Sequence, residues 1–376
     1  MKMANRRGFT LVEMMIAMVL AIIVVGALYM IYTNSVSAYR VEDQVLSMQE
    51  RLRFGLDHVK RDLRRAGFSV TPNSEVDTNV CYAPGELRAV SLLLRSGVNP
   101  LPMQNPNVSP TSLVLFGDFF SGQVYTTQAV QSDKVFLMDT NDPLTGAGSF
   151  PRSEAEFLRI FSPNRFLRIV TKDQFEIYTP IITANYLEKS ITLATPVPVT
   201  GAGGCGVTGF GDALDVNVAG FIRYSIQLDT RPNAPDWKTD LVREELQTDG
   251  ATPVADSALV IADYAVDLQF YDFGFDTAVA GAEPNLVTFR LPNMVAGTGA
   301  GRLDNFTGAV PHQLRFLSVK LTVRSEDEDP RHQYQARAQE YSHLDGFDIS
   351  DMDGACRTLS MGTRVFLTSI AVRNLR

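Results

Sequence analysis

One carboxylate in this sequence lies where a carboxylate is costly. Glu13 opens a run in which residues 14–32 carry no charge, about 28 Å of helix at 1.5 Å per residue and close to the thickness of a bilayer's hydrocarbon core. An acidic side chain near the end of a membrane helix costs on the order of 3 kcal/mol unless it reaches water or finds a partner. The chemistry that Glu13 can do is therefore ion pairing with a positive group.

Three cysteines offer a second kind of chemistry. Cys81, Cys205 and Cys356 are far apart in the sequence. In an oxidising compartment two of them can form a disulfide, which leaves the third over or pairs it between chains. Their spacing does not choose among the three pairings. We favour Cys81 with Cys205, because both lie in turn-rich segments after the N-terminal helix and a bond between them would close a long loop.

Motifs for catalysis or metal binding are weak. Residues 201–206 fit a phosphate-binding glycine pattern, but prolines precede them and no helical pattern follows, which favours a flexible loop. The three aspartates of residues 348–353 suggest a calcium loop, yet Ile349 and Ser360 stand at its first and last ligand positions, so an acidic turn is the simpler interpretation, with a calcium site of another type left open. We predict no enzyme, no cofactor and no metal, since the cysteines are isolated and no zinc-ligand spacing occurs among His58, His312, His332 and His343.

A long helix must position Glu13. No proline occurs between Tyr32 and Pro72, and past the apolar run the apolar residues recur at intervals of three or four, as on one side of a helix. Cations crowd the last turns, and Gly67 followed by Phe68 fits a glycine helix stop. We predict one helix whose residues 9–32 suit a membrane or a filament core and whose residues 33–67 are amphipathic. Its apolar stripe consists of Val45, Met48, Leu52, Leu56, Val59, Leu63 and Ala66.

The rest of the chain has the pattern of strands. Short apolar or alternating segments are separated by Gly, Pro, Asn and Asp, which is typical of antiparallel sheets. The predicted fold class is α+β, with the long N-terminal helix packed on a large antiparallel β-rich body over residues 68–376 and an optional division into two subdomains near residues 196–212. The predicted strands cover residues 88–94, 112–116, 134–138, 165–170, 175–179, 190–194, 219–228, 264–270, 316–324 and 364–372.

Charge indicates a side of the membrane and excludes one class of partner. Lys2, Arg6 and Arg7 precede Glu13 and no acid accompanies them, so the positive-inside bias keeps the N-terminus cytoplasmic and puts the body outside. The net charge is −8, or −11 without those three cations, which argues against a nucleic-acid surface. The length of the apolar run and the lack of a small-residue cleavage site argue against a secretory signal peptide. An ordinary single-pass membrane anchor would not explain the carboxylate of Glu13 in the membrane-length segment.

Residues 6–13, Arg-Arg-Gly-Phe-Thr-Leu-Val-Glu, resemble the N-terminal signature of type IV pilins and type II secretion pseudopilins. In that family a prepilin peptidase cuts after the glycine and methylates the new N-terminus. The resemblance implies that residues 1–8 are a leader, that cleavage falls between Gly8 and Phe9, and that Phe9 is N-methylated. It also implies a filament-assembly charge pair between the amine of Phe9 on one subunit and Glu13 on a neighbour, where a buried charge is tolerated because it is paired.

Three further segments, residues 62–68, 266–271 and 366–374, are similar in order and composition to blocks of PilW-type minor pilins. This resemblance implies a minor pilin that primes filament assembly and sits at or near the tip, first in the inner membrane and then in the extracellular pilus. The implied partners are the prepilin peptidase, other minor pilins, the major pilin and, as an option, a large tip adhesin. A J-like pseudopilin of type II secretion and a tip adhesion module are the alternatives. The cationic helix end fits a solvated face, with an acidic partner on an adjacent subunit as the alternative.

Overall fold

A computed structural model describes residues 10–93, 110–141, 150–198, 205–207, 210–232, 234, 238–276, 286–289, 314–326 and 363–371. The chain divides into two compact units, Met1–Glu50 and Arg51–Arg376. The fold class is α+β, as predicted: a long N-terminal helix and a large, mostly antiparallel β body.

The helix α1 runs from Leu11 to Arg65 without a break. It ends within two residues of the predicted stop. Gly67 has a φ of 71°, a left-handed conformation that glycine adopts at little cost. The N–H of Gly67 leaves the helix pattern and donates to the carbonyl of Phe116, 3.0 Å away. The glycine therefore turns the chain directly onto the sheet.

Within the described residues the larger of two sheets has eleven strands. A path of eight hydrogen-bonded neighbours runs β1-β7-β8-β5-β4-β9-β10-β11, while β2 pairs with β3, β3 with β9, and β6 with both β7 and β9. Only β1 and β7 pair in parallel among these. The strands are β1 (Val80–Tyr82), β2 (Val90–Leu93), β3 (Ser112–Gly117), β4 (Tyr125–Gln131), β5 (Lys134–Leu137), β6 (Phe166–Val170), β7 (Glu176–Asn185), β8 (Ser190–Leu193), β9 (Asp215–Leu228), β10 (Thr239–Leu246) and β11 (Leu259–Ala262).

The second sheet is antiparallel, in the order β13-β12-β14-β15. It consists of β12 (Ala265–Asp276), β13 (Leu286–Phe289), β14 (Leu314–Arg324) and β15 (Thr363–Ala371). Strand β12 follows β11 after a two-residue turn, and the Thr239 hydroxyl of β10 donates to the carbonyl of Ala265 at 2.7 Å. The two sheets are therefore linked at the start of β12.

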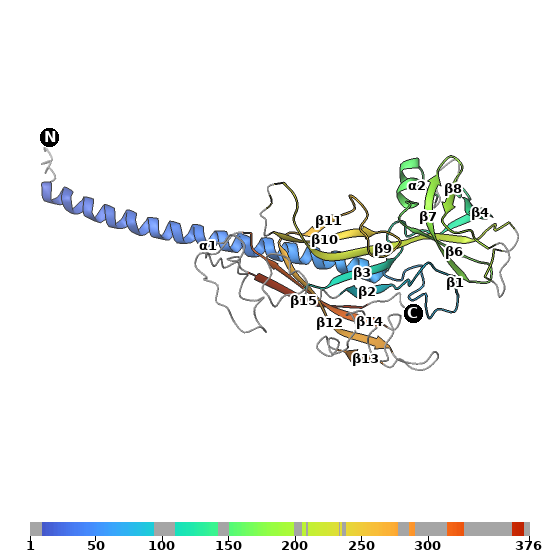
Figure 1. Cartoon of the computed structure of the whole chain (residues 1–376). Coiled ribbons are helices and arrows are strands. Elements are labelled where there is room, and N and C mark those ends of the chain that lie inside the picture. Colours follow the sequence, from blue (N-terminus) through green and yellow to red (C-terminus); the bar gives the residue numbers. More distant parts are fainter. Residues whose placement is uncertain are drawn as a thin grey trace, which may run out of the picture. The chain divides into compact units, whose positions relative to one another are not determined.

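The long strand β9 organises the body, because it pairs along its length with β3, β4, β6 and β10. Figure 1 shows β10 and β11 near one end of β9 and α2 (Glu154–Ile160), β7 and β8 near the other. The far end has its own apolar core, which includes Phe157, Ile169 and Val218. A second core beneath the helix exit joins Phe116, Phe166, Tyr178 and Phe221.

All ten predicted strands are present, with ends that differ by up to six residues. Sequence reasoning missed α2 and the strands β1, β4, β10, β11 and β13. Strand β10, with the sequence TDLVREEL, has too many charges to read as a buried strand. Its charges are nevertheless placed in ion pairs, such as Arg223 with Glu244 at 2.8 Å. Helix α2 has seven residues, too few to show a helical period, although Ser153 caps it by accepting the N–H of Glu156.

Candidate functional site

Glu13, the residue on which the sequence argument rests, caps the start of α1. Its Oε2 accepts the backbone N–H of Thr10 at 2.9 Å and the Thr10 hydroxyl at 3.0 Å. In return the N–H of Glu13 donates to the Thr10 hydroxyl oxygen at 3.2 Å. This is a reciprocal capping box of the T-x-x-E type. Sequence reasoning missed it, although the Thr10 to Glu13 spacing was the signal.

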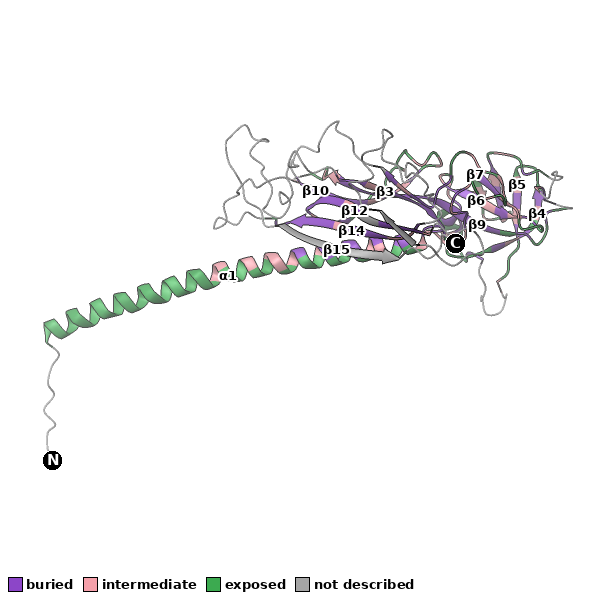
Figure 2. Ribbon diagram, turned by 90° about the horizontal axis from the view of Figure 1, so that it is seen from below, coloured by how far each residue is buried: buried purple, intermediate pink, exposed green. Residues whose placement is uncertain are grey.

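The helix that Glu13 opens exposes its large apolar side chains on all sides. From Leu11 to Tyr32 every residue is exposed, as Figure 2 shows in green. This helix is long and apolar enough to cross a membrane, and it is the one such helix in the described part of the chain. A helix that is apolar all round belongs in an apolar surrounding, either lipid or a bundle of similar helices. The proposed cleavage and methylation positions, Gly8 and Phe9, lie outside the described residues.

The last turns of α1 sit on the body through an apolar stripe. Leu52, Leu56, Val59, Leu63 and Ala66 are buried, which matches this part of the predicted stripe. Gly55 marks a close approach, because a Cβ there would meet side chains from β10, β11 and β14, those of Leu241, Ala262 and Leu321. The helix therefore packs against strands of both sheets.

A buried acid fixes this seat. The Oδ2 atom of Asp62 accepts two hydrogen bonds, one from the hydroxyl of Tyr224 and one from the Nε–H of Arg243, each at 2.7 Å. Burial, with help from Asp62, raises the pKa of Tyr224, so the phenol stays a donor. Burial works against the charge of Arg243, but Asp62, with help from Tyr224 and Glu245, outweighs it and raises the pKa of the guanidinium. The carboxylate is thus satisfied by two strands, β9 and β10, and sets the rotation of the helix on them.

An ionic cluster lies where β9 turns into β10. The Lys238 ammonium contacts Asp229 at 2.8 Å, Asp240 at 3.1 Å and Asp263 at 2.6 Å. Burial opposes the charge on Lys238, but these three carboxylates raise its pKa to about 12. Arg231 pairs with the same three acids. With each carboxylate shared between two cations, the cluster is suited to holding the turn in place and not to proton transfer.

One buried acid in the second sheet is not paired in this way. Asp267 and Thr322 face each other across β12 and β14, and both are fully buried. Within the described residues neither carboxylate oxygen of Asp267 nor the Thr322 hydroxyl has a hydrogen-bond partner. Burial raises the pKa of Asp267 to about 7, and it outweighs the attraction of Lys320 and weaker contacts with the Gln269 side chain and the Leu268 N–H, which all lower the pKa.

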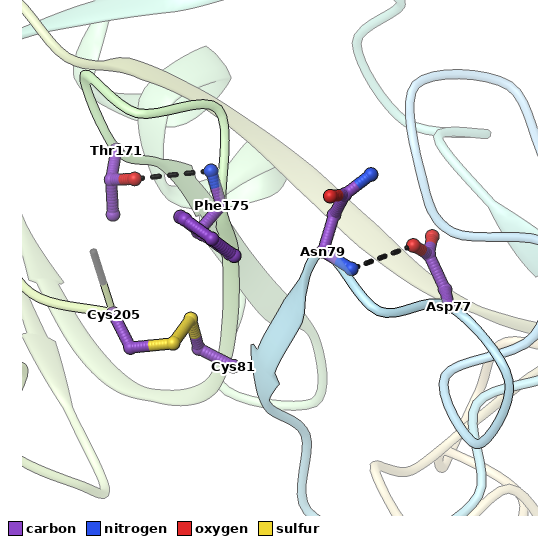
Figure 3. Close-up of a disulfide and its surroundings, with 6 residues drawn as sticks. All are labelled: Asp77, Asn79, Cys81, Thr171, Phe175 and Cys205. Carbon is purple, nitrogen blue, oxygen red and sulfur yellow. Dashed lines mark hydrogen bonds between the residues drawn. A yellow bond between two sulfur atoms is a disulfide. The ribbon is translucent and has the colours of Figure 1, made fainter. Parts of the chain in front are cut away.

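Cys81 and Cys205 form a disulfide with a Cα–Cα distance of 5.5 Å, the pairing favoured from the sequence. Figure 3 shows it beside β1 and the turn before β7. Local bonds hold both segments: the N–H of Asn79 donates to Asp77 at 3.0 Å and that of Phe175 to Thr171 at 3.1 Å. The two cysteines are 124 residues apart in the sequence. The disulfide therefore joins β1, which contains Cys81, to the segment that follows β8.

Of the other residues singled out from the sequence, those that the structure describes form no site. The described residues contain no group of three or more histidine, cysteine or acidic side chains able to hold a metal. The ring of His58 packs against that of Phe54 at a tilt of 54° with ring centroids 4.6 Å apart, and its Nδ1 lies 2.9 Å from Arg61. Cys356, most of the 201–206 glycine run, the 348–353 aspartates and the three other histidines lie outside the described residues.

Comparisons with known proteins agree with the N-terminal geometry. Residues 3–29 match the family described as the prokaryotic N-terminal methylation motif. Among solved structures the chain is similar to a type IV-like pilin from Thermus thermophilus, at 8% identity over 87% of this chain and 98% of that one. The TM-score of 0.28 is too low to say anything about the fold of the body. No curated protein matches the chain. In this chain the N-terminal methylation motif leads directly into an exposed apolar helix capped by Glu13, so its N-terminal segment is similar to that of type IV pilin-like proteins.

Proposed function

We propose that this protein is a PilW-type minor pilin of a type IV pilus, which primes filament assembly and sits at or near the tip. The observation that supports it best is the first half of α1. Its apolar side chains are exposed on all sides, and its single acid is satisfied locally by Thr10. Such a helix can rest in lipid and then exchange lipid for the helices of a filament without leaving a bare charge.

The size of the body favours the tip over the shaft. The chain has 376 residues, and the far core with the disulfide adds bulk beyond the strands that contact α1. A subunit repeated along a thin shaft has neighbours on every side, whereas a tip subunit has fewer. We therefore propose assembly with other minor pilins and the major pilin, after the prepilin peptidase has cut between Gly8 and Phe9. Before assembly the subunit would wait in the inner membrane with its body outside the cytoplasm.

Glu13 carries two roles that a pair of substitutions separates. A capping box accepts glutamine at this position as well as glutamate, so Glu13→Gln keeps the cap and removes the charge. Thr10→Ala keeps the charge and removes the cap. If Glu13 pairs with the amine of Phe9 on a neighbour, Glu13→Gln is cut normally but enters filaments poorly, and Thr10→Ala enters them better than Glu13→Gln does. Normal incorporation of Glu13→Gln would leave capping as the only role.

Deletion of the gene separates the proposed function from its alternatives. A primer predicts that surface filaments are lost, as counted by electron microscopy of the native host. A tip adhesion module predicts filaments that form but do not attach. A pseudopilin predicts normal filaments with folded enzymes no longer exported. Processing is tested by Gly8→Ala, for which we expect a full-length precursor on a gel; a normally shortened product would contradict the cleavage site.

A further inference from the structure

The outward side of α1 over the body is basic. Arg53, Phe54, Asp57, Arg61 and Arg64 are all exposed, and their spacing puts them on one side of the helix. We call these five residues the basic face. It lies opposite the buried stripe that seats the helix, and it holds three guanidiniums against one carboxylate. Phe54, with 53% of its surface exposed, gives it an apolar centre.

Two cations of this face, Arg53 and Arg61, contribute little to holding the described part of the protein together. Within the described residues Arg53 forms no ion pair. The Arg61 guanidinium is 3.8 Å from Asp62, whose other oxygen is occupied by Tyr224 and Arg243. Arg61 instead donates to the neutral ring of His58 at 2.9 Å. An exposed arginine with only weak partners in its own chain loses little stabilisation when it pairs instead with a carboxylate of another protein.

The charge of the whole chain indicates what kind of surface fits. Residues 51–65 contain six Lys and Arg against two Asp and Glu, whereas residues 68–376 contain 24 against 36, a net charge of −12. A body this acidic repels nucleic acid and anionic lipid, so a basic strip on one helix is poorly placed to bind either. Twenty residues of the sequence also lie between Tyr32, where the apolar run ends, and Arg53. A protein with an acidic surface is the matching partner.

We propose that the basic face docks on an acidic surface of a neighbouring pilin-type subunit; this rests on the proposed function. Phe54 would be the anchor, excluded from water at the centre of the contact, with Arg53 and Arg61 at the rim opposite carboxylates. Rim charges of this kind set orientation and choice of partner more than they add affinity. The basic face therefore selects which subunit lies next to this one, after the apolar part of α1 has brought the two together.

The test uses the full chain in its native host. Phe54 is replaced by photo-reactive benzoylphenylalanine, cells are irradiated, and cross-linked peptides are identified by mass spectrometry. We expect a cross-link to an Asp- or Glu-rich segment of another subunit with the N-terminal methylation motif. Adding Arg53→Glu with Arg61→Glu should lower its yield about tenfold, because like charges would face each other. The matched control reverses two exposed cations at the far end of the body, Arg159→Glu with Lys172→Glu, and should leave the yield unchanged.

Three outcomes would overturn the proposal: cross-links to lipid, nucleic acid or the same chain alone; a yield that does not fall in the Arg53, Arg61 variant; or an equal fall in the control. The neutral pair Arg53→Gln with Arg61→Gln should give an intermediate yield, and formation of the Cys81–Cys205 disulfide shows that each variant has folded. Loss of filaments on gene deletion is scored separately. Filaments that depend on the subunit but show no such cross-link would refute the basic face and leave the priming function standing.

Discussion

Replacing Asp267 with asparagine should stabilise the body at alkaline pH and do little at acid pH. Burial raises the pKa of this carboxyl from 3.8 to about 7, so the folded state holds a proton that the unfolded state has released. Stability is therefore highest below the unfolded pKa near 4 and falls as pH rises toward 7. An asparagine side chain does not titrate in this range, so Asp267→Asn removes this loss of stability at higher pH.

The size of the effect follows from the same values. The folded and unfolded pKa values differ by about three, and each pKa unit corresponds to about 1.36 kcal/mol. The largest possible change in the free energy of unfolding is therefore about 4 kcal/mol. Lys320 already offsets part of the burial cost, and the amide must still find partners beside Thr322. We expect Asp267→Asn to raise the free energy of unfolding by about 2–4 kcal/mol at pH 8 and by less than about 0.5 kcal/mol at pH 4.

The assay is urea unfolding of the full chain in mild detergent, followed by circular dichroism at both pH values. Asp256→Asn is the matched control, since Asp256 is exposed and sits at a φ of 58° that asparagine tolerates. Exposed substitutions of this kind change stability by less than about 0.5 kcal/mol. Equal effects of Asp267→Asn at pH 8 and pH 4 would refute the reasoning, and so would destabilisation at pH 8.

Three further substitutions test the seat of α1 and the disulfide. Asp62→Ala should cost about 3 kcal/mol in urea unfolding, because it leaves a partly buried guanidinium without its acid, whereas exposed Asp57→Ala should cost almost nothing; equal costs would contradict the buried pair. Gly67→Ala should lower stability by about 1 kcal/mol because its φ is positive, and an unchanged melting temperature would contradict the helix stop. Cys81→Ser should cost about 2–5 kcal/mol, since the bond to Cys205 closes a loop of 124 residues; reductant should then no longer affect the melting temperature, and a variant that still responds to it would point to another pairing.

Local patterns predicted the long helix, its glycine stop and ten strands, because each is encoded by neighbouring residues. The strand β10 escaped because its charged residues are neutralised by partners far away in sequence, as Glu245 is by Arg165 at 2.9 Å. The same limit applies to the site. The position of Glu13 was clear, but the contact of Asp62 with Arg243 joins residues 181 positions apart. Nothing local in the sequence marks such a contact.

The order of the cysteines along the chain bears on how the protein matures. Cys356 follows Cys205 by 151 residues, so at about 5–20 residues per second the ribosome delivers it roughly 8–30 s after the native pair is complete. An oxidant acting within that interval closes the Cys81–Cys205 bond before a competitor exists. With slower oxidation, which can take seconds to hours, all three thiols are present when the oxidant acts, so it can join Cys356 to Cys81 or to Cys205 and form the wrong pair. Production in a host that oxidises late should therefore require an isomerase that early oxidation makes unnecessary.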